Sequence, residues 1–137
     1  MISFKDFITE EECDNKEVTQ ADLDKLEAQL DKLFARVDID IEFTRHFKDR
    51  VNDERNRKQI TVCELRALFS EIASKFGKEI AKNRVGFEAV LKDISSDINV
   101  PFALGWNSQK RELELIAKTT MRKKNFQTSN KKYVVKS

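Results

Sequence analysis

One short stretch, Thr44 to Val51, contains the only histidine of the chain, and an arginine follows that histidine four residues later. If the stretch is helical, His46 and Arg50 lie one turn apart on one face, where they can reach a common ligand. An imidazole can move protons near neutral pH, and a guanidinium can hold an anion through two parallel hydrogen bonds. The pair therefore suits phosphate chemistry. A lone histidine on an amphipathic helix is more often a surface residue without a chemical role, and that interpretation stays open.

Length and composition limit the classes of protein to which this chain can belong. A chain of 137 residues with 36% charged side chains, three Gly and one Pro is typical of a single helix-rich domain with a real core. No apolar run is long enough to span a membrane, and the first residues lack the pattern of a signal peptide. The two cysteines lie far apart without metal-ligand spacing, which argues against a zinc site and favours a reducing, intracellular location.

The two parts of the chain differ in charge. Residues 1–42 carry 13 acidic and 5 basic side chains, whereas residues 43–137 carry 11 acidic and 21 basic ones. A basic body can attract nucleic acid, while an acidic segment can pack across it or repel other partners. Two solvated faces that only keep the chain soluble explain the same counts.

Hydrophobic periodicity predicts an α+β fold with N-terminal helices packed on a small C-terminal antiparallel β-sheet. Helical spacing covers 19–37, 44–52 and 61–82, and Thr-x-x-Asp or Thr-x-x-Glu capping boxes begin the first and third of these helices. Alternation predicts strands over 87–94, 100–106 and 113–121, with an extended link at 38–41. Pro101 suggests an edge position or a bulge. Residues 1–18 form an acidic N-terminal segment, and residues 19–137 form one α+β domain with a basic tail.

Two basic stretches are candidates for nucleic-acid contact. The first is the polar loop 54–59, and the second is the tail from 122, where aromatic residues are interleaved with the charges. The candidate residues are Arg55, Arg57, Lys58, Arg122, Lys123, Lys124, Lys131 and Lys132. A solvated connector explains the loop equally well, and a final edge strand at 133–135 with a border of lysines explains the tail.

The sequence His46-Phe47-Lys48-Asp49-Arg50 resembles the His-x-x-x-Arg pattern of the phage endoribonuclease RegB, which belongs to the RelE-like ribonuclease group. That group places N-terminal helices before a small sheet, and the order of elements over 44–135 is similar. The stretches 97–102 and 117–126 also resemble small uncharacterised proteins of tailed bacteriophages. RegB uses a second histidine that this chain lacks, so Lys118, Arg122, Lys123 or Glu114 would have to supply the second group.

This resemblance implies metal-independent cleavage of RNA, without a cofactor, through attack of a ribose 2′-OH on its own phosphate. His46 would transfer the proton, and Arg50 with Lys118 would stabilise the charge on the phosphate oxygens. RNA or another nucleic acid is the expected partner.

Two other classes stay open beside the ribonuclease: a nucleic-acid-binding module without catalysis, and a phage structural or assembly protein that contacts other phage structural proteins. The expected location is the host cytoplasm, or the virion for the third class.

Overall fold

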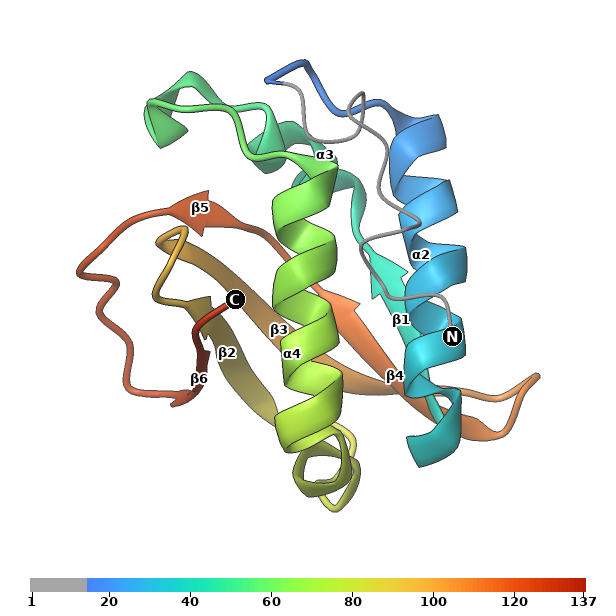
Figure 1. Ribbon diagram of the computed structural model, residues 1–137. Helices are drawn as coiled ribbons and strands as arrows, with labels where there is room; N and C mark the ends of the chain where they lie inside the picture. Colours follow the sequence, from blue (N-terminus) through green and yellow to red (C-terminus); the bar gives the residue numbers. More distant parts are fainter. Residues whose placement is uncertain (1–14) are drawn as a thin grey trace, which may run out of the picture.

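The computed structural model describes residues 15–137, which form an α+β fold with helices on one face of a sheet (Figure 1). The helices are α2 (Gln20–Phe34), α3 (Arg45–Val51) and α4 (Val62–Ala81), with 3-10 turns η2 (Ala35–Val37) and η3 (Glu54–Asn56). The strands are β1 (Ile39–Phe43), β2 (Glu88–Asp93), β3 (Ile98–Asn107), β4 (Glu112–Ala117), β5 (Met121–Arg122) and β6 (Lys131–Val135). The predicted fold class is confirmed. Of the predicted acidic segment 1–18, residues 1–14 lie outside the described residues.

The sheet is mixed but mostly antiparallel, and the predicted antiparallel C-terminal sheet forms its centre. Its strands follow the order β1-β4-β3-β2-β6, and β5 pairs with β3 beyond the end of β4. β3 is antiparallel to β2 and β4, but β1 is parallel to β4 and β6 is parallel to β2. Parallel pairing requires a crossover, and the β5–β6 segment provides one on the face opposite the helices. Lys92, which points to that face, donates to the carbonyls of Lys123 and Lys124.

The helix starts are fixed by the capping residues that the sequence predicted. Thr19 and Asp22 form a reciprocal capping box at α2, and Thr61 and Glu64 form another at α4. Each box satisfies two backbone N–H groups that have no partner within the helix. Thr44 caps α3 and also donates its hydroxyl to a backbone carbonyl just after β4, which ties α3 to the sheet.

The core lies between the sheet and the two long helices, which Figure 1 shows side by side across one sheet face. Both helices bury apolar stripes against the inner face of the sheet. The fully buried members include Leu26, Leu30, Phe34, Leu65, Phe69, Ile72, Val100, Phe102 and Leu115. No helix within residues 15–137 is long and apolar enough to cross a membrane.

The short helix α3 is anchored by its apolar side. Phe47 and Val51 are fully buried, as their spacing predicted, and burial of such side chains contributes about 1.5–3 kcal/mol each. Their neighbours His46 and Arg50 are consequently turned toward the outside of the molecule.

Two local predictions need correction. Residues 38–41 are not a link, because 39–43 pair with β4 as an edge strand. The third predicted strand ends at Ala117, and the chain pairs again only at β5.

Pro101 lies in a central strand and not at an edge, and the strand that pairs with it on one side is interrupted there. Pairing of β3 with β4 ends at Phe102–Ala117, and β5 resumes it at Asn99–Met121. Between these pairs, Lys118 N–H donates to the carbonyl of Pro101. The side of Pro101 that lacks an N–H therefore faces the interruption, where no ladder bond is lost.

Two carboxylates of α2 protect the outer side of edge strand β1. Asp31 accepts a hydrogen bond from the N–H of Ile41 at 2.7 Å, and Glu27 accepts one from the N–H of Phe43. Unpaired edge N–H groups can otherwise pair with another chain. Burial, together with the nearby carboxylates of Glu42 and Asp31, raises the pKa of Glu27 to about 7.

Replacing Glu27 with Gln is expected to stabilise the protein at alkaline pH, because Gln can still accept from Phe43 without bringing a charge into the cluster. The folded-state pKa of about 7 lies above the ordinary 4.5. The wild type therefore loses stability as pH rises from about 4.5 to about 7, and the stability advantage of the variant grows over the same pH range. Urea denaturation at about pH 5.5 and about pH 8.5 measures the difference. Asp24→Asn, on the exposed side of α2, is the charge control, and equal effects of both variants would contradict this account.

Candidate nucleic-acid interface

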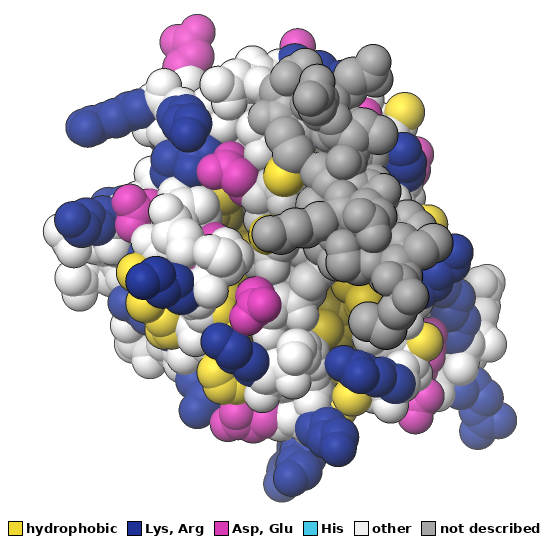
Figure 2. Space-filling model, in the orientation of Figure 1, with side chains coloured by type: hydrophobic (Ala, Val, Ile, Leu, Met, Phe, Trp, Pro, Cys, Tyr) yellow, Lys and Arg dark blue, Asp and Glu magenta, His cyan; other side chains and the backbone are white. Residues whose placement is uncertain are grey.

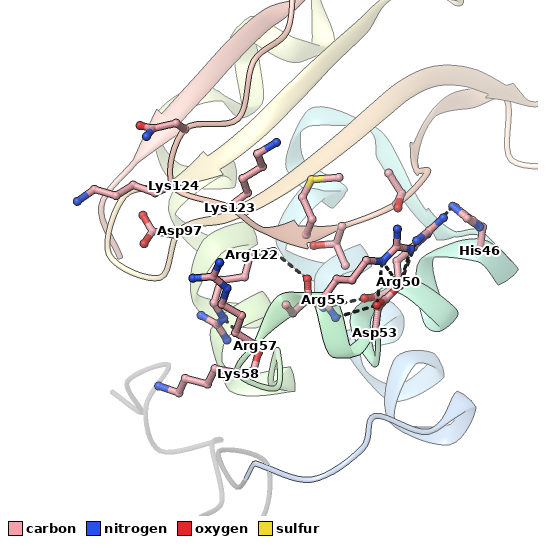
Figure 3. A pocket seen from close by; sticks show the side chains of 15 residues that line it. His46, Arg50, Asp53, Arg55, Arg57, Lys58, Asp97, Arg122, Lys123 and Lys124 are labelled. Atoms are coloured by element: carbon pink, nitrogen blue, oxygen red, sulfur yellow. Dashed lines mark hydrogen bonds and ion pairs between the residues drawn. The ribbon is translucent and has the colours of Figure 1, made fainter.

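A groove of about 890 Å³ opens between the α3–α4 connection and the segment that follows β4 (Figure 3). Its lining comes from residues 46–58, from Asp97 in the β2–β3 turn and from residues 119–125. Eight of the eleven site residues predicted from the sequence line it: His46, Arg50, Arg55, Arg57, Lys58, Arg122, Lys123 and Lys124. We call this feature the basic groove.

Positive charge dominates the basic groove. Seven of its fifteen lining residues are Lys or Arg and two are Asp. Asp53 is paired with Arg50 and Arg55, so its charge is already balanced within the groove. Figure 2 shows Lys and Arg side chains gathered at the upper left, over the α3–α4 connection. A surface of this kind attracts polyanions.

His46 and Arg50 lie together at one end of the basic groove (Figure 3). Nε of Arg50 donates to Nε2 of His46 at 3.1 Å. The same guanidinium donates to Asp53 at 3.1 Å, and Arg55 donates to Asp53 at 2.8 Å. Nε2 is the acceptor of this hydrogen bond, so its lone pair can take a proton from a hydroxyl when Arg50 turns toward a phosphate.

Arg122 has no donor to spare for a ligand, because all five N–H groups of its guanidinium are used within the protein. Nε donates to the carbonyl of Lys58, Nη1 donates to Glu64 and to the carbonyl of Ser96, and Nη2 donates to Glu64 and to the carbonyl of Gln59. The side chain is only 13% exposed. Arg122 therefore holds the groove together, and its guanidinium has no unoccupied N–H for the nucleic-acid contact that the sequence predicted.

Asn56 also joins the two sides of the groove, the α3–α4 connection and the segment that follows β4, through hydrogen bonds to their backbone. Its side-chain oxygen accepts from the N–H of Arg122 at 3.0 Å, and its amide nitrogen donates to the carbonyl of Arg50 at 2.8 Å. Burial alone would raise the pKa of Glu64, but hydrogen bonds from Arg122 and Thr61 outweigh it and hold that pKa below 4.5. Glu64 thus remains ionised opposite Arg122 at neutral pH.

The other end of the basic groove is formed by four cations whose side chains, unlike those of Arg50, Arg55 and Arg122, have no partner within residues 15–137. Arg57, Lys58, Lys123 and Lys124 lie away from His46 in Figure 3. Within residues 15–137, none of these four side chains has a hydrogen bond or an ion pair. Their donors are therefore available to an anion.

Three predicted site residues lie outside the basic groove. Nζ of Lys118 donates to Glu88 at 2.6 Å, across the sheet face opposite the helices. Lys131 pairs with Glu79 at 3.5 Å, and Lys132 donates to a backbone carbonyl of the β5–β6 segment. Lys118 therefore does not accompany His46 and Arg50, and the other two residues belong to edge strand β6.

Sequence reasoning missed Asp53, Asn56 and Asp97. Asp53 follows Arg50 by three residues, which is ion-pair spacing and could have been recognised. Asn56 gave no signal, because a buried asparagine within a polar run looks like any loop residue. Asp97 joins the groove only through the β2–β3 turn, which sequence spacing does not reveal.

One group of carboxylates within residues 15–137 has spacing suited to a metal ion, and it lies outside the groove. Ligand oxygens of Asp40, Glu42 and Glu114 lie within 4.8 Å of one another on β1 and β4. Asp40 is 6% exposed and already binds Nζ of Lys110 at 2.8 Å. Burial, with nearby carboxylates, raises the pKa of Glu42 and of Glu114. None of these three carboxylates lines the groove that contains His46.

Comparisons of the chain with protein-family models, with curated proteins and with solved structures find no match.

Replacing Arg122 with Met is expected to destabilise the protein by about 2–4 kcal/mol at neutral pH, because it leaves Glu64 without its partner and three carbonyls without their donor. The loss should shrink as pH falls through the lowered pKa of Glu64, since the wild type then also loses the ionised partner. Denaturant unfolding at neutral and acidic pH measures both effects. Arg122→Lys, which keeps the charge but not the five donors, should recover only part of the loss, and full recovery would contradict the assigned geometry.

Proposed function

We propose that this protein binds RNA in the basic groove. The observation that carries the proposal is the convergence of cations from two distant segments, 55–58 and 122–124, on one groove. Four of these cations have no side-chain partner within the described residues, and phosphate oxygens are suitable acceptors for them. Neutralising phosphates releases counterions, which favours binding and makes it depend on salt. The resemblance of the His46–Arg50 motif to RegB supports RNA as the nucleic acid.

Replacing Arg57 and Lys58 together with Gln is expected to weaken binding of a single-stranded RNA and to reduce its salt dependence. Each phosphate contact contributes about 0.7 to the slope of log K against log salt, so the double variant should lose about 1.4. Fluorescence anisotropy over a salt series measures this slope. The control is Lys75→Gln with Lys78→Gln, which removes the same charge from α4 outside the groove. Equal losses in both double variants would mean that binding is nonspecific, and that result would contradict the proposal.

A second candidate function is cleavage of the bound RNA, and it rests on the position of His46 and Arg50 within the same groove. In this reaction Nε2 of His46 takes the proton of a ribose 2′-OH. The O2′ attacks the adjacent phosphorus, and the bond from phosphorus to O5′ breaks. Arg50 stabilises the charge that develops on the phosphate oxygens. The products are a 2′,3′-cyclic phosphate and a free 5′-OH.

The leaving O5′ needs a proton, and the groove narrows the choice of its donor. Of the four groups considered from the sequence, Lys118 is paired with Glu88, Arg122 is fully occupied, and Glu114 belongs to the acidic cluster on β4. Lys123 lines the basic groove, but at the end away from His46. In the cleavage hypothesis the leaving O5′ therefore takes its proton from solvent water, since the groove is open to solvent.

Cleavage is expected to require His46 and no divalent metal. Wild-type protein incubated with end-labelled RNA in EDTA should give fragments ending in a cyclic phosphate, and His46→Gln should reduce the rate by about 100-fold or more while binding persists. A denaturing gel reads cleavage, and a native gel reads binding. Fragments from His46→Gln at the wild-type rate would exclude this residue as the base. Binding without fragments from either protein would leave a binding module.

A further inference from the structure

The two ends of the basic groove differ in their internal bonding. At one end, His46, Arg50, Asp53 and Arg55 bond to one another. At the other end, Arg57, Lys58, Lys123 and Lys124 line the groove, and none of their side chains has a partner within residues 15–137. An anion that reaches this second end gains donors without breaking an existing bond. Phosphate binding should therefore be strongest away from His46.

The backbone that carries Arg57 and Lys58 is held on both sides. Asn56 bonds to Arg50 and Arg122, and the carbonyls of Lys58 and Gln59 both accept from Arg122. Arg57 itself adopts a φ of 66°, a conformation that a residue with a Cβ rarely takes. Strained backbone held by its surroundings is often found at binding sites.

The backbone of Lys123 and Lys124 is held in a similar way on the opposite wall. The N–H of Lys123 donates to the carbonyl of Asp97, while the carbonyl of Lys123 accepts from Asn99 at 2.8 Å. Lys92 donates to the carbonyls of both lysines. With their backbone held against the sheet, the two lysine side chains are left to line the groove. Both pairs of cations thus stand on fixed backbone, which lowers the cost of ordering them around a ligand.

Resting on the proposed function, we propose that the ligand is a single RNA strand of several nucleotides, whose phosphates bind Arg57, Lys58, Lys123 and Lys124 while another part of the same strand lies at His46 and Arg50. Figure 3 shows these two groups at opposite ends of the groove. A mononucleotide or dinucleotide fills one end only. Single-strand sites span roughly four or more nucleotides, which fits a ligand that reaches both ends.

A single strand fits this arrangement better than a duplex. The cations stand on two walls, the η3 connection and the segment after β5, and face a shared groove. A strand that enters between the walls can contact both pairs, whereas a duplex carries its phosphates on the outside and meets only the rim. Asp97 lies at the same end of the groove, and its negative charge repels a phosphate placed directly beside it. A base can occupy that position instead, because its amino group can donate a hydrogen bond to the Asp97 carboxylate.

The test is a length series of single-stranded RNA of about 2, 4, 8 and 12 nucleotides, together with a duplex of the longest one, each titrated over salt. For an 8-mer that engages four cations, raising salt from about 50 to about 200 mM should lower affinity about 50-fold, against about threefold for a dinucleotide with one contact. Affinity should rise with length up to about 8 nucleotides and then level off.

Lys123→Gln with Lys124→Gln should reduce the salt slope of the 8-mer by about 1.4 and that of the dinucleotide, which makes one contact, by no more than about 0.7. Lys75→Gln with Lys78→Gln should change neither. A dinucleotide that binds as tightly as the 8-mer, or a duplex that binds more tightly than the single strand, would overturn this inference while RNA binding itself stands. Absence of binding by any of these RNAs would instead overturn the proposed function.

Discussion

The arrangement around the basic groove depends on one side chain, the guanidinium of Arg122. Its five hydrogen bonds join β5 to two segments that are distant from it in sequence: residues 58–64, which run from the end of the α3–α4 connection into the first turn of α4, and the β2–β3 turn. A guanidinium suits this role because it stays charged and presents its donors in a fixed plane. Glu64 serves two purposes in the same place, since it caps α4 through Thr61 and neutralises Arg122. The start of α4 and the wall of the groove are therefore fixed together.

Local chemistry explains why much of the fold was predictable. The helix boundaries follow from capping residues and from apolar periodicity, which act over a few residues and are visible in the sequence. The strand partners were less accessible. β1 holds only five residues, and its partner β4 lies some 70 positions later, so nothing local distinguishes it from an extended link. The parallel β2–β6 pair depends on a crossover that Lys92 and Asn99 fasten from the sheet, again through long-range contacts.

In the candidate site, too, the local features were predictable from the sequence and the long-range contacts were not. His46 and Arg50 are one helical turn apart, so their proximity was predictable, and the basic character of 55–58 and 122–124 was evident from composition. The convergence of these segments was not, because it depends on Asn56 and Arg122, which look like ordinary polar residues in the sequence. Lys118 shows that adjacent residues can lie on different faces of the sheet. It directly precedes Thr119, which lines the groove, yet its side chain lies on the other face of the sheet and pairs with Glu88.

The cations of the groove divide into those that serve folding and those that do not. Arg122 is spent on internal bonds, and Arg50 and Arg55 share Asp53, so these charges stabilise the protein without a ligand. Arg57, Lys58, Lys123 and Lys124 bring like charges to one end of the groove. Among the described residues that line this end, only Asp97 carries the opposite charge, so mutual repulsion of the cations disfavours the folded state. A chain selected for stability alone would separate such charges, particularly at a position such as Arg57, whose backbone is already strained. The RNA that we propose as the ligand would neutralise these charges when it binds, and their repulsion would then no longer oppose folding.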